Sequence, residues 1–545
     1  MLVTRPIALA AAIVVALLAV SGARGTSAQT PKRGGTLVFR LVGPEPACLN
    51  ILSDACIGPP TLWGITNAVL ESPFELLPDF RYRPQLATAT LTKRRPFTLT
   101  YRINPDARWS DGKPITSTDF VFTLHAIRKY GYQDLRDLHA VVRSIHTVDA
   151  KRFKVVLKPR SSLWHDLFGN VLPAHALRGA DLSKVWTTSI DNPKTGEPIG
   201  SGPFLVERWD RGRQLVLRRN PRYWGSHSSY LDRIVVVFAA TASDPTEALR
   251  SGALDIAQGV PSDLVPAVRR EPGIRVAPVS SPVIEHLDFQ FGPDAHPALQ
   301  HGNPRSKLVR QAIAYGIDRE RIVRQVYGAV DPTLHALQSL VLVTQSRGYA
   351  ATWSRYRYRP ARARGLLEQA GCRRGSDGIY SCAGKRLSLR FETSAGFVTR
   401  QRVLSLVQAQ LRQVGVEVLP VFVVPSTFFT QTLPGGTFDV ALYTWVFSPG
   451  GSWSDVYGCG GASNYTHYCQ RLVTADLNEA GRILDARQQA RVLNRADERM
   501  SNDVPSLPLY QQVLTTAFQA EVRNYVPHPS VLNPFWNAEN WSLDR

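Results

Sequence analysis

Six cysteines are the residues whose type and spacing indicate chemistry most directly. They form three close pairs along the chain: Cys48 with Cys56, Cys372 with Cys382, and Cys459 with Cys469. In an oxidising compartment, cysteines this close in sequence form local disulfides. Sequence alone does not fix the connectivity, so other pairings stay open. We expect three local bridges, each stabilising the fold by about 2 to 3 kcal/mol.

A metal site is the alternative for the last pair, because His467 lies between Cys459 and Cys469. A zinc site, however, is typically built from closely spaced Cys-x-x-Cys motifs or from additional nearby histidines. We therefore favour the disulfide and expect neither a metal nor another cofactor.

Motifs of enzyme active sites do not occur in the sequence. There is no Gly-x-Ser-x-Gly elbow, no His-Glu-x-x-His pair and no phosphate-binding Gly-x-x-x-x-Gly-Lys loop. The tripeptide Gly200-Ser201-Gly202 lacks the spacing of a nucleophile elbow. We expect no catalytic residues and a protein that is not an enzyme.

The N-terminus has the pattern of a secretory signal peptide. Arg5 precedes an apolar run from Ile7 to Val20, and small residues lead to Ala28. We expect cleavage after Ala28; cleavage after Ala23 and an uncleaved anchor helix are the alternatives. No cysteine stands at the cleavage point and Cys48 lies too far along, so we expect an exported, periplasmic or extracytoplasmic protein that is not lipid-anchored through an N-terminal Cys.

The length and charge of the chain restrict its class. With 545 residues the chain is long enough for two or three domains, and its net charge is +20. The basic residues are mostly dispersed arginines, and no nucleic-acid-binding module is present. We expect a soluble monomer with solvated charged faces and no nucleic-acid partner.

Periodicity predicts a mixed α/β fold along the whole chain. Thr116 and Asp119 form a capping box before a helix that ends at Gly131. A strand, a helix and a strand are predicted between Leu387 and Val423, which implies a partly parallel sheet. The segment Phe438–Trp445 is predicted as a strand that places Tyr443 and Trp445 on one face.

One long run of residues resembles a known family. The segment from Tyr101 to Phe122, YRINPDARWSDGKPITSTDFVF, is similar to the signature of the family 5 extracellular solute-binding proteins, which include dipeptide-, oligopeptide- and nickel-binding members of ABC importers. Further motifs follow in the family's order, and we expect most of them to be scaffold: Leu172–His175, Gly200–Phe204, Asn220–Trp224, Ser251–Asp255, Val309–Ile313, Ile317–Arg319 and Val504–Tyr510.

The resemblance implies a two-lobed, periplasmic-binding-protein-like α/β fold of type II, in its large three-subdomain form, with a hinge between the lobes. By analogy, residues 1–28 are the signal peptide, 29–280 the first part of lobe I with an inserted subdomain at about 60–190, 281–502 lobe II, and 503–545 the C-terminal return to lobe I. The implied function is to capture a peptide or peptide-like solute and deliver it to the permease and ATPase subunits of an importer.

The resemblance also places the ligand near a tryptophan. In peptide-binding members an acid a few residues after the position of Trp445 neutralises the ligand ammonium, and here that position is Ser448. A serine cannot neutralise a buried ammonium, which puts the usual mode of peptide capture in doubt. Asp455 in the following loop and Glu285 near the first crossover are the candidate substitutes.

Four aromatic residues are further candidates for ligand contact. Trp445 and Tyr443 offer apolar area at the pocket floor, Tyr510 matches a crossover tyrosine, and Trp63 lies in a segment that often faces the cleft in relatives. Core packing is the alternative for each. A metal chelate, an oligosaccharide or another small polar solute stays open as the ligand, and a chaperone-like role is a third possibility.

Overall fold

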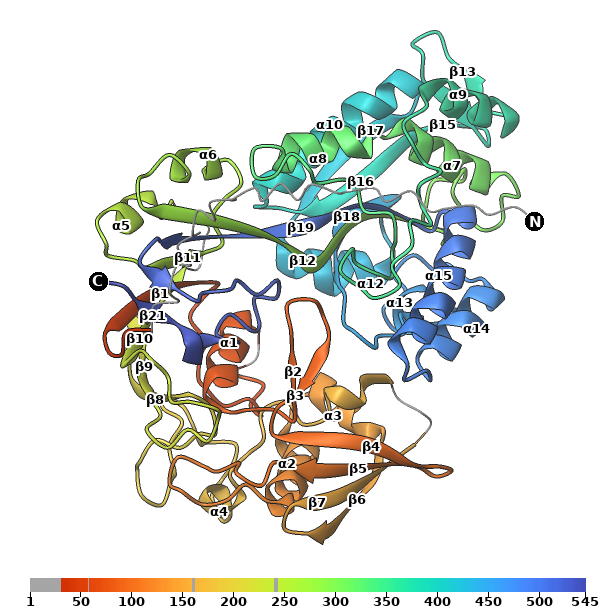
Figure 1. Ribbon diagram of the computed structural model, residues 1–545. Helices are drawn as coiled ribbons and strands as arrows, with labels where there is room; N and C mark the ends of the chain where they lie inside the picture. The colour runs from red at the N-terminus through yellow and green to blue at the C-terminus, as the bar shows by residue number, and fades with distance from the viewer. Residues whose placement is uncertain (1–30, 57, 159–161, 240–243) are drawn as a thin grey trace, which may run out of the picture.

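The computed structural model describes residues 31–545 except 57, 159–161 and 240–243, so the expected signal peptide at 1–28 lies outside the described residues. A ten-stranded sheet runs through both halves of the molecule (Figure 1). Its strands, in spatial order, are β17 (Glu417–Val423), β16 (Ser388–Ser394), β18 (Val440–Val446), β12 (Ile274–Phe289), β19 (Ser506–Gln519), β11 (Ile256–Gln258), β1 (Thr36–Val42), β10 (Arg233–Ala239), β9 (Gln214–Arg219) and β8 (Phe204–Asp210).

Two long antiparallel strands connect the halves. β12 has 16 residues and β19 has 14, and both cross the middle of the molecule in Figure 1. Their pairing is irregular between Ser280 and Ile284 and again between Glu285 and His286. Such irregularities bend a strand and increase its twist. The bend therefore lies within residues 280–286.

The first lobe contains the β8–β11 end of the sheet and a separate four-stranded sheet at the bottom of Figure 1. Thr116 and Asp119 form the predicted capping box at the start of α2, which ends before Gly131. Gly64 of α1 lies against Leu41 of β1, so α1 packs on the large sheet. The remaining elements of this lobe are α1 (Pro60–Val69), β2 (Phe74–Leu76), β3 (Tyr82–Pro84), β4 (Ala87–Arg94), β5 (Phe97–Ile103), α2 (Ser117–Tyr130), α3 (Gln133–Ala140), β6 (Val142–Asp149), β7 (Arg152–Leu157), η1 (Ser162–His165), α4 (Ala174–Leu177), α5 (Thr246–Arg250), α6 (Val265–Val268), β20 (Val522–Arg523), η3 (Ala538–Asn540) and β21 (Ser542–Leu543).

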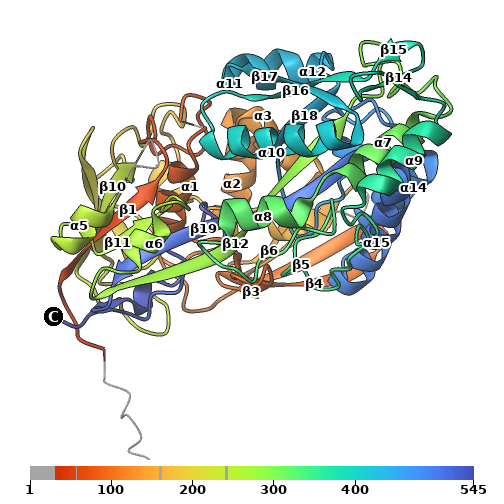
Figure 2. The same ribbon diagram turned by 90° about the horizontal axis from the view of Figure 1, so that it is seen from above.

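The second lobe contains the β16–β18 end of the sheet. β16 pairs in parallel with β17 and with β18, which confirms the parallel strand–helix–strand prediction. Helix α10 packs on β17 at this end of the sheet, and helix α8 packs on β19, as the view from above shows (Figure 2). Its other elements are α7 (Ser306–Gly316), α8 (Arg319–Tyr327), α9 (Pro360–Gln369), β13 (Arg373–Arg374), β14 (Tyr380–Cys382), β15 (Lys385–Arg386), α10 (Val398–Val414), α11 (Pro425–Thr427), η2 (Phe428–Thr432), α12 (Leu433–Gly435), α13 (Ser454–Tyr457), α14 (Arg471–Ala480) and α15 (Ala486–Asp503).

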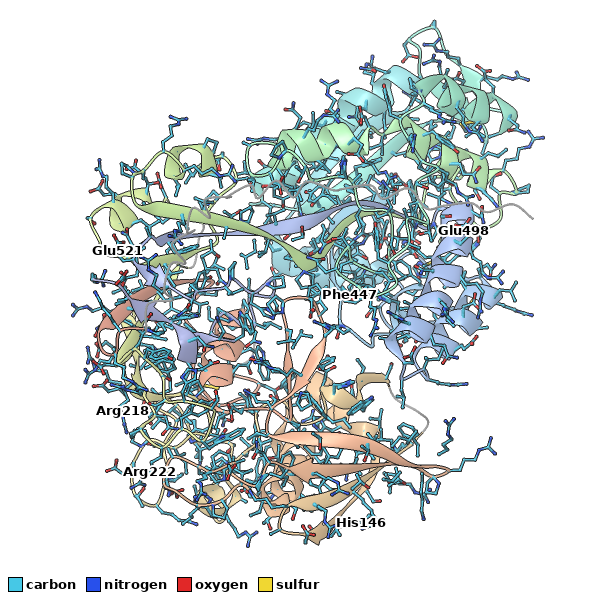
Figure 3. All side chains as sticks on the ribbon, in the orientation of Figure 1. His146, Arg218, Arg222, Phe447, Glu498 and Glu521 are labelled. Atoms are coloured by element: carbon cyan, nitrogen blue, oxygen red, sulfur yellow. A yellow bond between two sulfur atoms is a disulfide. The ribbon has the colours of Figure 1, made fainter. Side chains whose placement is uncertain are left out.

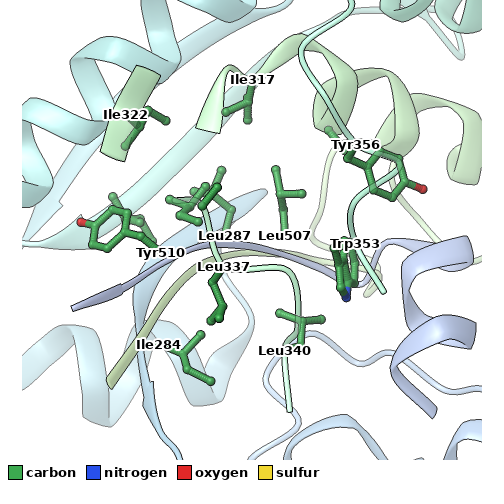
Figure 4. Packing of buried hydrophobic residues seen from close by; sticks show 14 of the residues in the cluster. Ile284, Leu287, Ile317, Ile322, Leu337, Leu340, Trp353, Tyr356, Leu507 and Tyr510 are labelled. Carbon is green, nitrogen blue, oxygen red and sulfur yellow. The ribbon is translucent and has the colours of Figure 1, made fainter. Parts of the chain in front are cut away.

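Two large hydrophobic clusters form most of the core. One cluster is centred on β1, β5, β7 and α2, and the other on β12, β19, β16 and α7. Figure 4 shows the second cluster where the two long strands pass beneath Ile317 and Ile322. The second cluster extends to Val265 and Val268 of α6 in the first lobe. The long strands β12 and β19, which connect the two lobes, favour motion of the lobes about a hinge.

The three cysteine pairs are at bonding distance, as the sequence predicted. The Cα atoms lie 5.0 Å apart for Cys48–Cys56, 4.3 Å for Cys372–Cys382 and 4.4 Å for Cys459–Cys469. The second bridge joins Cys372, which lies between α9 and β13, to Cys382 of β14 and so fixes the small β13–β15 sheet. His467 is the residue that suggested a metal site as the alternative. Its Nδ1 lies 2.8 Å from Oε1 of Gln290, at hydrogen-bond distance.

Candidate ligand-binding site

The carboxyl ends of β16, β17 and β18 lie at one edge of the sheet, because these strands run parallel. In open α/β sheets, ligands bind outside this edge. Large apolar side chains are exposed just beyond the three strand ends: Phe397 after β16, Val424 after β17 and Val446 at the end of β18. Exposed apolar residues gathered at such an edge are typical of a binding surface.

Trp445 and Ser448 are placed at this edge. Trp445 is half-buried on β18 and stacks on Tyr465, with ring centroids 5.9 Å apart. Its indole Nε1 is buried and has no hydrogen-bond partner in the described part of the chain. Ser448 is exposed in the loop that follows β18. An unpaired indole donor beside an exposed loop is a group that a ligand acceptor can satisfy.

Tyr443 and Tyr510 lie inside the protein. The Tyr443 hydroxyl donates to Oδ2 of the buried Asp288 at 2.5 Å. Tyr510 is 1% exposed and sits within the cluster of Figure 4, with its ring against Tyr327. Burial and the nearby Glu285 hold the pKa of Tyr510 well above its usual value. Both tyrosines therefore lie in the core, and neither lines the two cavities described below.

The two acids considered as ammonium partners differ in environment. Glu285 is buried on β12, and its Oε1 lies 2.8 Å from Nε of Arg400. This carboxylate is already neutralised inside the protein, so it is not free for a ligand. Asp455 is exposed in the first turn of α13 and lines none of the cavities described below.

A cavity of about 290 Å³ lies between the lobes. On one side is the tip of the β2–β3 hairpin with Phe80, and on the other are Phe447, Pro449 and Gly450, which directly follow β18. The rings of Phe80 and Phe447 meet edge to face with centroids 5.7 Å apart. Figure 3 shows Phe447 near the centre of the molecule, between the two halves.

A second cavity of about 800 Å³ lies within the first lobe. It shares Tyr82 and His165 with the cavity between the lobes, so these two stacked rings, 4.3 Å apart, stand between the cavities. Trp63, a candidate from the sequence, is one of its walls. Both volumes are of the order that small-molecule and peptide sites occupy, since such sites typically measure about 300 to 1,000 Å³.

The larger cavity is rich in carboxyl groups: Glu71, Glu75, Asp166 and Glu539. Burial is the main cause of their shifts. It raises the pKa of Glu71 to about 8, against the opposing effects of Tyr223 and Trp224, and raises the pKa of Asp166 to about 6, against its hydrogen bond from Tyr82. Burial likewise raises the pKa of Glu75 and Glu539. Burial thus disfavours the charged form of all four carboxyl groups, and a nearby cation favours it.

Sequence reasoning missed Phe80, Phe447 and Glu71. Phe447 and its neighbours could have been found, because they follow the strand that carries Trp445. Glu71 had an indirect signal: its backbone N–H donates to Oγ of Ser201 at 2.8 Å, and the Tyr223 hydroxyl donates to its Oε1 at 2.9 Å. Ser201 and Tyr223 belong to two motifs assigned to the scaffold. Through these two hydrogen bonds, Ser201 and Tyr223 hold Glu71 in place.

Lobes joined by two strands can open and close around a solute, and the cavities within and between them make this a solute-binding protein. The chain belongs to the bacterial extracellular solute-binding proteins of family 5, because the model of the family's middle region matches residues 81–467. Among the described residues, no helix has the length and apolar character needed to cross a membrane.

Known relatives agree with this family. The chain is 30% identical over 446 residues to the oligopeptide-binding protein OppA of Mycobacterium tuberculosis, which covers 80% of this chain and 72% of the relative. The periplasmic EDTA-binding protein EppA has the same fold, with a TM-score of 0.80 at 22% identity over 95% of this chain and 98% of that one. AppA from Bacillus subtilis, solved with a nonapeptide, gives a TM-score of 0.71 at 22% identity over 95% and 100%.

Proposed function

We propose that this protein is the extracytoplasmic binding component of an ABC importer and captures a peptide or peptide-like solute between its lobes. The observation that carries the proposal is the pair of adjoining cavities that share Tyr82 and His165. One lies between the lobes and the other extends into the first lobe, so an extended ligand can contact both. The OppA and AppA relatives, which are named as oligopeptide-binding proteins, support a peptide.

In this proposal, the lobes divide near the irregular pairing of β12 and β19, with residues 281–502 as the second lobe. Closure brings Phe447 and Pro449 onto the hairpin around Phe80, and the closed form is the one that the permease and ATPase subunits recognise. The mature protein acts as an exported monomer, without a lipid on an N-terminal cysteine.

A non-peptide solute is the alternative. The similarity to the EDTA-binding protein EppA favours a metal chelate among such solutes. The charges in the larger cavity disfavour an anionic chelate, because four carboxyl side chains and a single arginine, Arg83, line it. Placing further negative charge among buried carboxyls is costly.

Mass spectrometry of small molecules released by denaturing gently purified mature protein tests the proposal. Recovered peptides, bound again by the emptied protein in calorimetry with saturable stoichiometry, support it. Recovery of a sugar or a chelate contradicts peptide capture while leaving the transport role in place. Suppression of aggregation without saturable binding points instead to a chaperone.

A further inference from the structure

The cavity in the first lobe has a charge opposite to that of the chain. Lysine and arginine exceed aspartate and glutamate by 64 to 44 in the whole sequence. The walls of this cavity, by contrast, carry four carboxyl side chains and only one guanidinium group, that of Arg83. A basic protein with a carboxyl-lined cavity draws cations to that place and not to its general surface.

Most of these carboxyls have no cationic partner. Arg83 forms its ion pair with Glu75, which leaves Glu71, Asp166 and Glu539. In the part of the chain that the structure describes, none of these three acids lies within ion-pair distance of a lysine, arginine or histidine. The 24 ion pairs of the described residues include Glu75 with Arg83 but none of these three acids. These three carboxyl groups are therefore available to a cationic ligand, and the charge of such a ligand favours their ionised form.

Glu71 is the most deeply placed of the three. Its side chain is 1% exposed, and its Oε1 accepts hydrogen bonds from Tyr223 and, at 3.0 Å, from Nε2 of Gln85. Its Oε2 is buried and has no hydrogen-bond partner among the described residues. A buried carboxyl oxygen without a partner calls for an explanation, and a ligand donor supplies one.

Aromatic rings form the other walls of the cavity. Trp63, Trp224 and Trp536 line it together with Tyr82 and Tyr223. A cation over the face of an aromatic ring is stabilised by about 0.5 to 2 kcal/mol, with tryptophan the best partner. Carboxyls and indoles around one volume form a combination that accepts ammonium and guanidinium groups and rejects carboxylates.

We propose that this cavity is the subsite for a positively charged group of the ligand, a primary ammonium or a guanidinium. The inference rests on the proposed function, since the charged group is taken to belong to a bound peptide. It also explains why a serine, Ser448, stands where relatives have an acid. Glu71, Asp166 and Glu539 hold the ligand cation in the first lobe, so no acid is needed in the second lobe. The source of the cation is either the peptide N-terminus or a lysine or arginine side chain.

Calorimetry with matched peptides tests this assignment and separates the two sources. The probes are tetra-alanine, its N-acetyl form, and alanine tetrapeptides carrying lysine or its neutral isostere norleucine at each position. We expect the preferred cationic peptide to bind at least about tenfold more tightly than its neutral counterpart. Loss of affinity on acetylation assigns the cation to the N-terminus, and preference for lysine over norleucine assigns it to a side chain.

Variants connect this preference to the cavity. Glu539→Gln and Asp166→Asn are expected to reduce the ratio of cationic to neutral affinity at least threefold, and Glu71→Gln to reduce it further. Glu392→Gln is the control, since Glu392 is a buried acid of β16 that lines neither cavity. If Glu71→Gln does not fold, the other two variants decide.

Failure of the inference differs from failure of the proposed function. If peptides bind equally well whether cationic or neutral, or if the preference persists in all three variants, the subsite is overturned while peptide capture stands. If no peptide binds, arginine amide is titrated as a probe. Its binding to wild-type protein and its loss in Glu539→Gln support the subsite without the peptide, and its failure to bind overturns both.

Discussion

Nε of Arg400, near the start of α10, lies 2.8 Å from Oε1 of Glu285 on β12, and the two side chains are 8% and 1% exposed. The second carboxylate oxygen of Glu285 accepts a hydrogen bond from Nε2 of Gln512 on β19 at 2.8 Å. The ion pair ties β12 to α10 of the second lobe, and the hydrogen bond from Gln512 joins β19 to the same carboxylate. These contacts anchor the strands next to the irregular stretch of their pairing.

Glu285→Ala tests this anchor. Removing one partner of a buried ion pair leaves an uncompensated charge, so we expect the free energy of unfolding to fall by about 3 to 5 kcal/mol. Urea unfolding followed by circular dichroism measures the change. Glu285→Leu combined with Arg400→Leu is the control and should recover much of the loss, because both charges are removed. A loss below about 1 kcal/mol in the single variant contradicts the anchoring role.

Glu71 predicts a pH dependence of stability. Its pKa is raised from 4.5 to about 8 in the folded protein, mainly by burial. Between these values the folded state binds more protons than the unfolded state, so the free energy of unfolding falls as pH rises and is lowest above pH 8. We expect Glu71→Gln to remove a fall on the order of 3 to 5 kcal/mol.

Urea unfolding of wild-type protein and Glu71→Gln, at several values from acidic to alkaline pH, checks this prediction. The comparison uses the difference between the two proteins at each pH, so that other titrating groups cancel. Glu392→Gln in the second lobe is compared as well, and we expect it to change the profile in the same direction but by less, because burial also raises the pKa of Glu392. Parallel profiles for wild type and Glu71→Gln across the whole range are the contradicting result.

The disulfide at Cys372–Cys382 predicts a local stabilisation. Both cysteines are buried in the core of the second lobe, and the bridge closes a loop with a sequence separation of 10. Replacing both by alanine is expected to lower the free energy of unfolding by about 2 to 3 kcal/mol. Thermal unfolding measures this, and peptide mapping without reductant should yield the three local pairs. A crosslink between different pairs contradicts the assigned connectivity.

Local signals predicted most of the fold. The capping box at Thr116 and the strand–helix–strand run from Leu387 to Val423 depend on residues close in sequence, and both occur as expected. The site depends on contacts between distant segments. Glu285 meets Arg400 across 115 residues, which no local pattern signals. The carboxyls of the larger cavity likewise come from three separated segments around Glu71, Asp166 and Glu539, and only the folded chain brings them together.

The contact between Phe80 and Phe447 predicts the balance between open and closed lobes. Both side chains are 7% exposed, and Phe80, at the tip of the β2–β3 hairpin, is buried in the hydrophobic cluster of the second lobe. Opening the lobes exposes this ring. Phe80→Ala therefore weakens the closed arrangement by about 2 to 3 kcal/mol, which shifts the ratio of closed to open protein by roughly 30- to 150-fold.

Small-angle scattering and peptide titration measure this shift. We expect Phe80→Ala to have a larger radius of gyration than wild type without ligand and a weaker affinity for the recovered peptide, because ligand binding must then also stabilise closure. Phe429→Ala is the matched control: Phe429 is an exposed aromatic residue of η2 in the second lobe that lines neither cavity. Equal scattering and equal affinity for the two variants mean that the hairpin tip does not hold the lobes together.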